Sequence, residues 1–201
     1  MKYLFIDTSN SFINIYIIND NNVLVYKKVE TLKDMANTIM PLIREAFNEV
    51  KFDIKDIDKI FVTIGPGSFT GIRVGITVAK TISYCLNIPV YPISTLEYLS
   101  SINTNYSKII SIIDARRNNV FAGFYDSKLN KIEAEKLVGY NSIDITDDTV
   151  VVSYDGIYDS SVLDIDIIKL IDKHKNDKAV NPHMLVPNYL KKTEAEEMLN
   201  G

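Results

Sequence analysis

Two stretches of this chain, residues 3–20 and 109–126, repeat one pattern, and this repetition limits the possible folds more than any other feature. Each stretch opens with an apolar run that ends in an aspartate, Asp7 in the first and Asp114 in the second. A polar turn and a second run of β-favouring residues follow in both. Runs of this kind separated by turn residues predict β-hairpins. The chain therefore reads as a duplication of one structural unit.

The remainder of each half continues in a matching order. In the first half a third β-favouring run covers 23–29, helical periodicity covers 31–50, and a buried strand at 60–64 precedes a second helix over 71–86. The second half reads in the same order, so each half is expected to form a β-β-β-α-β-α lobe. Two such lobes make up the α/β fold of the actin, Hsp70 ATPase and sugar kinase group (the ASKHA, RNase H-like fold). A chance likeness between two α+β segments is the alternative.

We expect an N-terminal lobe at residues 1–100 and a C-terminal lobe at 101–201. The second lobe is expected to be the shorter one, because few residues separate its third β-favouring run from its next strand. In the first lobe, the helix at 31–50 is expected to begin at a capping-box-like pair, Thr31 and Asp34. Proline within a helix removes a hydrogen bond, so a kink or break is also expected there, at position 41.

Composition narrows the range of functions. The formal net charge of −4 argues against a protein that grips nucleic acid unaided, although it allows nucleic acid bound jointly with a partner. Cys85 is the only cysteine, so no internal disulfide forms, a reducing compartment is expected, and the thiol is predicted to be a small buried hydrophobe. Asp7 interrupts the apolar N-terminal run, so a signal peptide is not expected, and no window predicts a membrane span. The expected location is the cytoplasm.

The strand-end aspartates suggest a nucleotide-dependent activity, which the turns after them do not favour. Asp7 and Asp114 could hold Mg²⁺ through water, or they could simply accept backbone N–H groups at the start of a turn. Phosphate-binding loops need glycines, and neither turn contains one. An autonomous ATP-dependent phosphotransferase or ATPase is therefore the alternative function. No metal site is expected, because His174 and His183 lie outside any metal-binding motif and read as solvated surface residues.

The stretch "TIGPGSFTGIRVG" at 63–75 contains four of the chain's eight glycines. Its first part predicts a sharp turn, in which proline fixes φ and the glycines allow a positive φ. The next helix is expected to be capped from Ser68 or Thr70. Phe69 is an apolar side chain in this loop, either an internal anchor or a surface for a partner. The residues of the predicted turn are Gly65, Pro66 and Gly67.

A stripe of small residues continues along the following helix at intervals of four. Its members are Gly71, Gly75, Ala79 and Ser83, which share one helix face. Glycine inside a helix costs about 1 kcal/mol relative to alanine, so a close approach of another backbone is expected at this face. The face packs either on the chain's own sheet or first helix, or on a second subunit. Arg73 could pair with an acid, hold an anion or remain solvated.

Four sequence motifs resemble those of the TsaB (YeaZ) family. "GPGSFTGIRVG" is similar to the family signature, and "LFIDTS", "DARRNNVF" and "PNYLKKTEAE" resemble the family's start, its Asp-Ala-Arg motif and its C-terminal segment. The likeness covers most of the chain. Outside the signature, the matching residues are Asp7, Thr8, Ser9, Asp114, Ala115, Arg116, Tyr189, Leu190, Ala195 and Glu196.

The resemblance implies a non-catalytic accessory subunit for making threonylcarbamoyladenosine next to the anticodon of tRNA. It implies a heterodimer with the transferase TsaD, a ternary complex with the ATPase TsaE, contact with tRNA through that complex, and a homodimer when TsaD is absent. It implies no cofactor for this chain, with ATP or ADP possible in the complex. The subunit contacts would come from the helices at 31–50 and 71–86. The interface residues so implied are Met35, Ile39, Leu42, Phe69, Gly71, Arg73, Gly75, Ala79 and Ser83.

Overall fold

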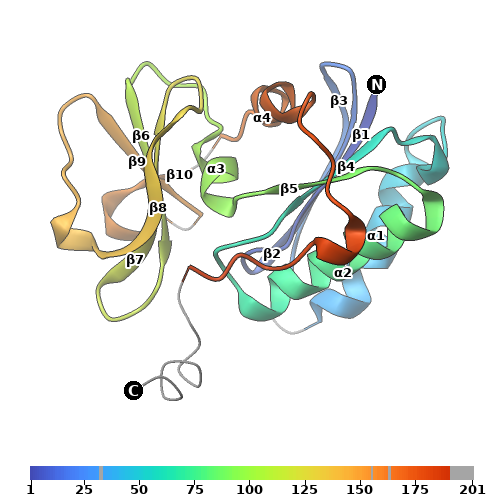
Figure 1. The fold of residues 1–201 in the computed structure, drawn as a ribbon, viewed down its shortest axis with the longest axis horizontal. Coiled ribbons are helices and arrows are strands. Elements are labelled where there is room, and N and C mark those ends of the chain that lie inside the picture. The colour runs from blue at the N-terminus through green and yellow to red at the C-terminus, as the bar shows by residue number, and fades with distance from the viewer. Residues whose placement is uncertain (32–33, 155, 163, 191–201) are drawn as a thin grey trace. The chain divides into compact units, whose positions relative to one another are not determined.

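The computed structural model divides the chain into two compact units, each described here by itself (Figure 1). The first contains Met1–Thr95 and Ile167–Pro187, and the second contains Leu96–Asp166 and continues from Asn188. The division lies at Thr95 and Leu96 rather than at residue 100, and residues 167–187 belong with the first unit rather than the second. The described residues are 1–31, 34–154, 156–162 and 164–190.

A five-stranded sheet forms the centre of the first unit, in the order β3-β2-β1-β4-β5. The first three strands are antiparallel, and β4 and β5 run parallel to β1. Nearly all of β1 and β2 is buried, because elements cover both faces of the sheet. The predicted strands of this half are confirmed. Their bounds are β1 Lys2–Asp7, β2 Phe12–Asn19, β3 Asn22–Glu30, β4 Lys59–Thr63 and β5 Val90–Ile93.

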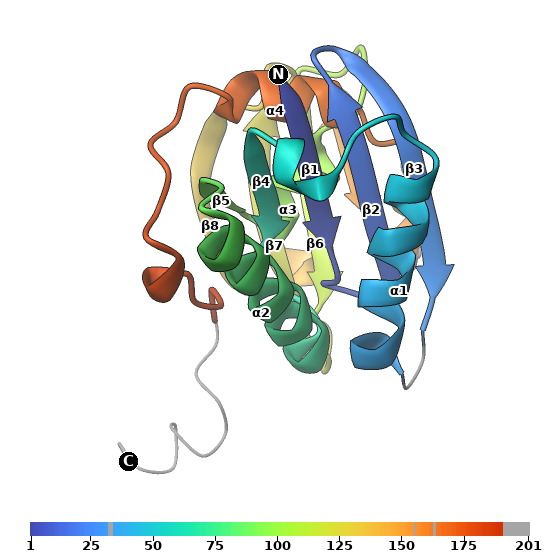
Figure 2. The same cartoon turned by 90° about the vertical axis from the view of Figure 1, so that its right-hand side faces the viewer.

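Two helices, α1 (Met35–Asn48) and α2 (Phe69–Leu86), lie side by side on one face of this sheet (Figure 2). Their apolar residues and those of the strands form one core, to which Ile39, Ile43 and Ala79 contribute. A short 3-10 helix, η1 (Ile54–Asp56), follows α1. A fourth helix, α4 (Ile167–His174), lies on the opposite side of the sheet (Figure 1).

Two details of α1 differ from expectation. The helix begins at Met35 with Asp34 as its N-cap residue, and the Asp34 side chain makes no capping bond, so the expected capping box starting at Thr31 was wrong. The Asp34 carboxylate instead accepts a hydrogen bond of 2.5 Å from the Asn37 side chain. The helix also continues through Pro41 without a break, supported by the apolar face that it buries.

The end of α2 agrees with the sequence prediction, but its cysteine does not. The helix stops at Leu86, where Asn87 adopts the left-handed conformation of a helix cap. Cys85 is exposed rather than buried, because it lies away from the face of α2 that meets the sheet. None of the described helices combines the length and the apolar character needed to cross a membrane.

The open edge of this sheet, at β5, is covered by a later part of the chain. Val180 forms an antiparallel bridge to Val90, with a hydrogen bond of 3.0 Å from the Val180 N–H to the Val90 carbonyl. Pro92 in the same strand has no N–H to offer. A 3-10 helix, η4 (Pro182–Met184), follows and contacts α2. The edge therefore offers little for another strand to pair with.

The second unit repeats the sheet of the first, in the order β10-β9-β6-β7-β8. Its first three strands are antiparallel and β9 runs parallel to β6, as β4 does to β1. The duplicated ASKHA-type fold is therefore confirmed by its two sheets. The strands are β6 Lys108–Asp114, β7 Asn119–Asp126, β8 Lys131–Gly139, β9 Thr149–Ser153 and β10 Ser161–Val162.

The helices of the second half differ from the expected α-helices. The links after β8 and β9 contain 3-10 helices, η2 (Tyr140–Ser142) and η3 (Ile157–Asp159). The residues between β8 and β9 are too few for a crossover helix, since such a connection usually needs a dozen or more. The remaining short helix, α3 (Thr95–Ser100), begins at the last residue of the first unit, and α4 belongs to the first unit.

Candidate functional site

The glycine segment wraps around the turn between β1 and β2. A Cβ atom at Gly67 would lie 2.3 Å from the carbonyl oxygen of Ser9, and Gly67 has a φ of +151°. The Ser68 N–H donates a hydrogen bond of 2.7 Å to the same oxygen. The Gly65–Pro66 peptide bond before it is cis. The turn predicted at this point is therefore confirmed, and it packs against the chain's own hairpin.

The small-residue stripe of α2 faces the same hairpin. A Cβ atom at Gly71 would lie 2.0 Å from the Thr8 carbonyl oxygen, and one at Gly75 would lie 2.2 Å from Thr8 Oγ1. Thr8 Oγ1 also donates a hydrogen bond of 2.8 Å to the Gly71 carbonyl. Farther along α2, Ala79 and Ser83 are buried too. At Gly71 and Gly75 the group that approaches α2 is therefore Thr8 of the same chain, which agrees with the alternative that the stripe packs internally.

Most of the interface residues predicted on α1 are internal as well. Met35, Ile39 and Leu42 are buried in the core that α1 shares with the sheet. Their helical spacing reflects this packing, which sequence periodicity cannot distinguish from contact with a partner. Of the nine predicted residues, Phe69 and Arg73 are exposed. The Phe69 side chain is 46% exposed, and the Arg73 guanidinium lies 3.7 Å from the centre of the Phe69 ring.

Asp7 is buried and its carboxylate is fully engaged by the protein. Oδ1 accepts hydrogen bonds from Ser9 N (3.0 Å), Ser9 Oγ (2.6 Å) and Thr63 Oγ1 (2.7 Å). Oδ2 accepts one from Asn14 Nδ2 (2.9 Å), and Tyr26 donates to the Asn14 carbonyl oxygen (3.0 Å). Such a carboxylate ties the ends of β1 and β4 to the hairpin turn. This arrangement matches the turn-anchoring interpretation of Asp7.

Asp114, the counterpart of Asp7, is exposed in its own unit. Its Oδ1 accepts a hydrogen bond of 2.8 Å from the Arg116 N–H, as a turn-initiating aspartate does. Ala115 N–H pairs with the carbonyl of Asn119 at 2.9 Å and closes the hairpin. The side chain of Tyr189, in the C-terminal motif, is exposed, and Leu190 after it is half-buried. Ala195 and Glu196 lie outside the described residues.

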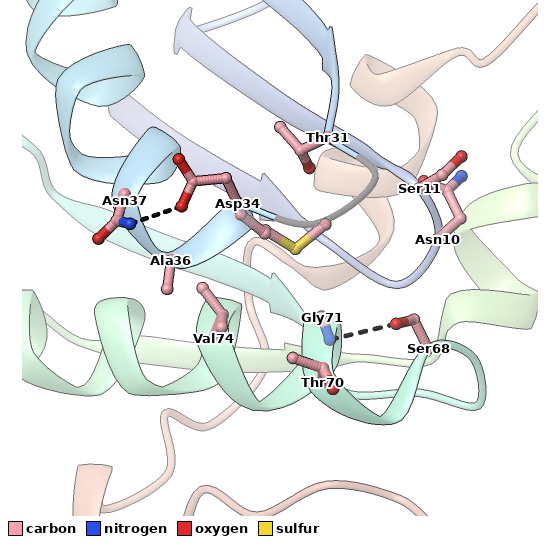
Figure 3. A pocket seen from close by; sticks show the side chains of 11 residues that line it. Asn10, Ser11, Thr31, Asp34, Ala36, Asn37, Ser68, Thr70, Gly71 and Val74 are labelled. Carbon is pink, nitrogen blue, oxygen red and sulfur yellow. Dashed lines mark hydrogen bonds between the residues drawn. The ribbon is translucent and has the colours of Figure 1, made fainter.

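A groove runs between the outer faces of α1 and α2. Its first part is a cavity of about 720 Å³ where both helices begin beside the β1–β2 turn (Figure 3). The Asp34–Asn37 hydrogen bond lies on the α1 side, and a hydrogen bond of 3.2 Å from the Gly71 N–H to Ser68 Oγ caps α2. The cap predicted at Ser68 is thus confirmed. Thr70 lies in the first turn of α2 and its side chain makes no capping bond among the described residues.

The groove continues along both helices. A second cavity of about 400 Å³ shares Ala36 and Val74 with the first and is bordered by Phe69 and Arg73. One turn farther along α1, Met40 is 48% exposed and lines a separate cavity of about 320 Å³ between α1 and η1, to which α2 contributes no residue. We call the first two cavities with their exposed border the α1–α2 groove. The sequence analysis did not identify Ala36, Met40 and Val74 as surface residues. The only sequence signal for them is that they do not fall on the buried apolar positions of their helices.

The described residues contain no group of three or more histidine, cysteine, aspartate or glutamate side chains placed to hold a metal ion. His174 is more engaged than a solvated residue, since its Nδ1 lies 2.6 Å from Asp177 Oδ2. His183 is exposed and its ring packs against that of Tyr84.

Comparison with known proteins identifies the family. The sequence model of TsaD, tRNA N6-adenosine threonylcarbamoyltransferase, matches residues 29–156. The TsaB protein of Bacillus subtilis is 36% identical over 134 residues, which are 66% of this chain and 58% of that protein. The TsaB protein of Escherichia coli is 26% identical over 135 residues, with the same two coverages. The chain belongs to the TsaD family, and within it the chain is similar to TsaB proteins.

TsaB proteins take part in the biosynthesis of threonylcarbamoyladenosine in tRNA, as their name states. The matched part of the chain spans little more than half the length of these curated relatives. Solved structures extend the likeness of the fold. YeaZ from Pseudomonas aeruginosa has a TM-score of 0.81 at 20% identity, covering 94% of this chain and 99% of that one. A second solved structure, of a P. aeruginosa protein described as similar to peptidase YeaZ, has a TM-score of 0.82 at 19% identity with the same coverages.

Proposed function

We propose that this TsaB-family chain is an accessory subunit that docks on the transferase TsaD through the α1–α2 groove and performs no chemistry of its own. The observation that carries the proposal is the exposed Phe69 side chain, held under the Arg73 guanidinium at the border of a groove between two helices. The inner faces of both helices are fixed by the core and by the β1–β2 turn. The outer faces are therefore a rigid surface ready for a partner.

The residue types along the groove support docking. Phenylalanine, methionine and arginine are enriched in protein interfaces, and a few such residues usually contribute most of the binding energy. Phe69 and Arg73 border the groove on α2, and Met40 is an exposed residue of the adjacent helix α1. A stable interface buries about 800 Å² on each partner, and two helices side by side offer a surface of that order.

The surroundings of Asp7 support an accessory rather than a catalytic role. All four of its donors come from the same lobe, so the carboxylate is already satisfied without a metal ion or a nucleotide. The alternative, an autonomous ATP-dependent phosphotransferase or ATPase, requires this group to face a ligand. ATP turnover by the purified chain at an enzyme's rate would favour that alternative.

The accessory role has a simple thermodynamic form. A subunit that binds only the active conformation of TsaD raises the population of that conformation. In this proposal TsaE joins the pair, and the chain contacts tRNA only through the complex. ATP or ADP binds only in the assembled complex. The chain works in the cytoplasm. When TsaD is absent, the same groove pairs two copies of the chain.

Titration calorimetry of the chain with TsaD from the same organism tests the docking surface. Phe69→Asp and Arg73→Glu should each weaken binding at least about ten-fold, as loss of a hot-spot residue does. Leu24→Asp is the matched control, because Leu24 is an exposed apolar residue of the same unit on β3. Thermal unfolding should be nearly unchanged in all three variants. Native affinity in a folded Phe69→Asp, Arg73→Glu double variant would disprove docking through this groove.

A further inference from the structure

A separate cavity of about 610 Å³ lies in the first unit, between the C-terminal end of α2 and the residues that lead into η4. It shares no lining residue with the α1–α2 groove, which surrounds the other end of α2. Its lining includes Tyr84, Asn87, Ile88, Val180, Asn181 and His183.

Two aromatic rings form one wall of this cavity. Tyr84 is 67% exposed, and its ring centre lies 5.2 Å from that of His183 with the planes at 66°. His183 is held in place by its N–H, which donates a hydrogen bond of 2.9 Å to Asn181 Oδ1. A planar ligand that stacks on one ring would meet the other edge-on, and both geometries are favourable for aromatic groups.

Two amide side chains lie at the same cavity. Asn87 is fixed by the left-handed cap of α2, and its side chain makes no hydrogen bond among the described residues. The side-chain N–H₂ of Asn181 is also without an acceptor in the described part of the chain. An amide presents a donor and an acceptor together, which is the pattern that pairs with the edge of a nucleobase.

Two lysines lie close in the sequence to residues that line the cavity, although neither lysine lines it. Lys80 lies one turn before Tyr84 on α2, and Lys178 directly precedes the lining residue Ala179. Neither lysine forms an ion pair with any residue that the structure describes. The nearby carboxylate of Asp177 is engaged by His174. Lysines without a carboxylate partner near the cavity in the sequence are suited to attract a phosphate group.

We propose that this cavity binds a nucleobase that carries a phosphate. The base stacks on Tyr84 or His183, the Asn87 or Asn181 amide reads its edge, and Lys80 and Lys178 attract the phosphate. The ligand is either a free nucleotide or one residue of single-stranded RNA, which share this chemistry. The inference concerns a different surface from the proposed docking groove and does not depend on it.

Proton NMR of the intact chain provides a direct test, because the chain has only two histidines. The His183→Gln variant assigns the two ring C2–H signals. Adding AMP should shift the His183 signal and leave that of His174 unchanged, whereas ribose 5-phosphate, which lacks the base, should shift neither. An equal shift with ribose 5-phosphate would overturn the proposal, since it would indicate a simple anion site.

A short adenine-rich oligoribonucleotide distinguishes the two sources. Binding at least ten-fold tighter than that of AMP indicates RNA, and equal or weaker binding indicates a free nucleotide. Tyr84→Ala should weaken the better ligand about ten-fold through lost stacking, and Tyr84→Phe should retain most of the affinity. Tyr106→Ala, which removes an exposed tyrosine of the second unit, is the control. No shift of His183 with either ligand at millimolar concentration, in protein with a native His174 signal, would also overturn the proposal.

Discussion

Gly75 and Thr8 occupy adjoining space so closely that a Cβ atom at position 75 would lie 2.2 Å from Thr8 Oγ1. The same hydroxyl holds the Gly71 carbonyl one turn earlier. Thr8 belongs to the turn that follows β1, so the glycines of α2 allow the hairpin and the helix to meet. The glycine signature therefore maintains the shape of the first unit, and the surface that we propose for docking lies on the other side of the helix.

Gly75→Ala should destabilise the chain although alanine is the better helix former. The helix gains about 1 kcal/mol, but overpacking against Thr8 costs about 1–3 kcal/mol, and the contact is too short for small adjustments to relieve. Urea unfolding measures the difference. Combining Gly75→Ala with Thr8→Ala should give a smaller loss than the sum of the two single losses, because Thr8 Oγ1 is the obstructing atom. Strict additivity would contradict this contact.

Replacing Asp7 by alanine should cost about 3 kcal/mol, because four buried donors lose their acceptor. Asp7→Asn should cost less, since its single carbonyl oxygen can still accept the three donors that now meet Oδ1. Chemical denaturation monitored by tyrosine fluorescence measures both variants. Equal stability of Asp7→Ala and the parent chain would show that this carboxylate is not an internal anchor.

Acid sensitivity of the second unit should depend on Ser107. Its hydroxyl and its N–H (3.0 Å) both donate to the Asp148 carboxylate and hold the pKa of Asp148 below its ordinary value. Because the folded-state pKa is the lower one, the stabilisation is complete above the unfolded-state pKa and is lost as pH falls through the folded-state pKa. Ser107→Ala should raise the pKa of Asp148, as carboxyl ¹³C NMR would detect. An unchanged titration curve would contradict the assigned cause.

Leu170→Ala should destabilise the first unit, although residue 170 follows the sheet of the second unit in sequence. Leu170 is fully buried in α4, and loss of a buried leucine typically costs about 2–5 kcal/mol. Hydrogen exchange should show weaker protection in β1 and β4 in this variant. Lys178→Ala, at an exposed position after α4, is the control. Weaker protection confined to strands β6 to β9 would show that α4 packs on the second unit and would contradict its assignment to the first.

Local pattern was sufficient to predict most of the fold. The strands at 3–20, 23–29 and 109–126 and the end of α2 follow from alternation and from turn and cap residues, which depend on near neighbours in the sequence. The helices of the second half were not predictable in the same way. Whether a link becomes an α-helix or a 3-10 turn depends on the distance that it must span, which the sequence alone does not state.

The candidate site shows more clearly what the sequence alone does not predict. Periodicity identifies which residues of α1 and α2 share a face, but it does not say what covers that face. Ile39 and Gly75 were therefore assigned to a partner, although their own sheet and hairpin cover them. The residues around Phe69 left it open whether this side chain is an internal anchor or a surface for a partner, and the structure exposes it. The cavity at Tyr84 depends on Val180 and His183, which are distant in sequence, and no local signal indicated it.

The return of residues 167–187 to the first unit has a consequence for biogenesis. A ribosome adds about 5–20 residues per second, so α4 emerges on the order of ten seconds after Thr95. During that interval α4 does not yet cover its face of the N-terminal sheet, and Val180 does not yet pair with the β5 edge. The N-terminal lobe thus receives its last helix and its edge partner only after the intervening 71 residues, 96–166, have been synthesised, and the rate of translation sets this delay.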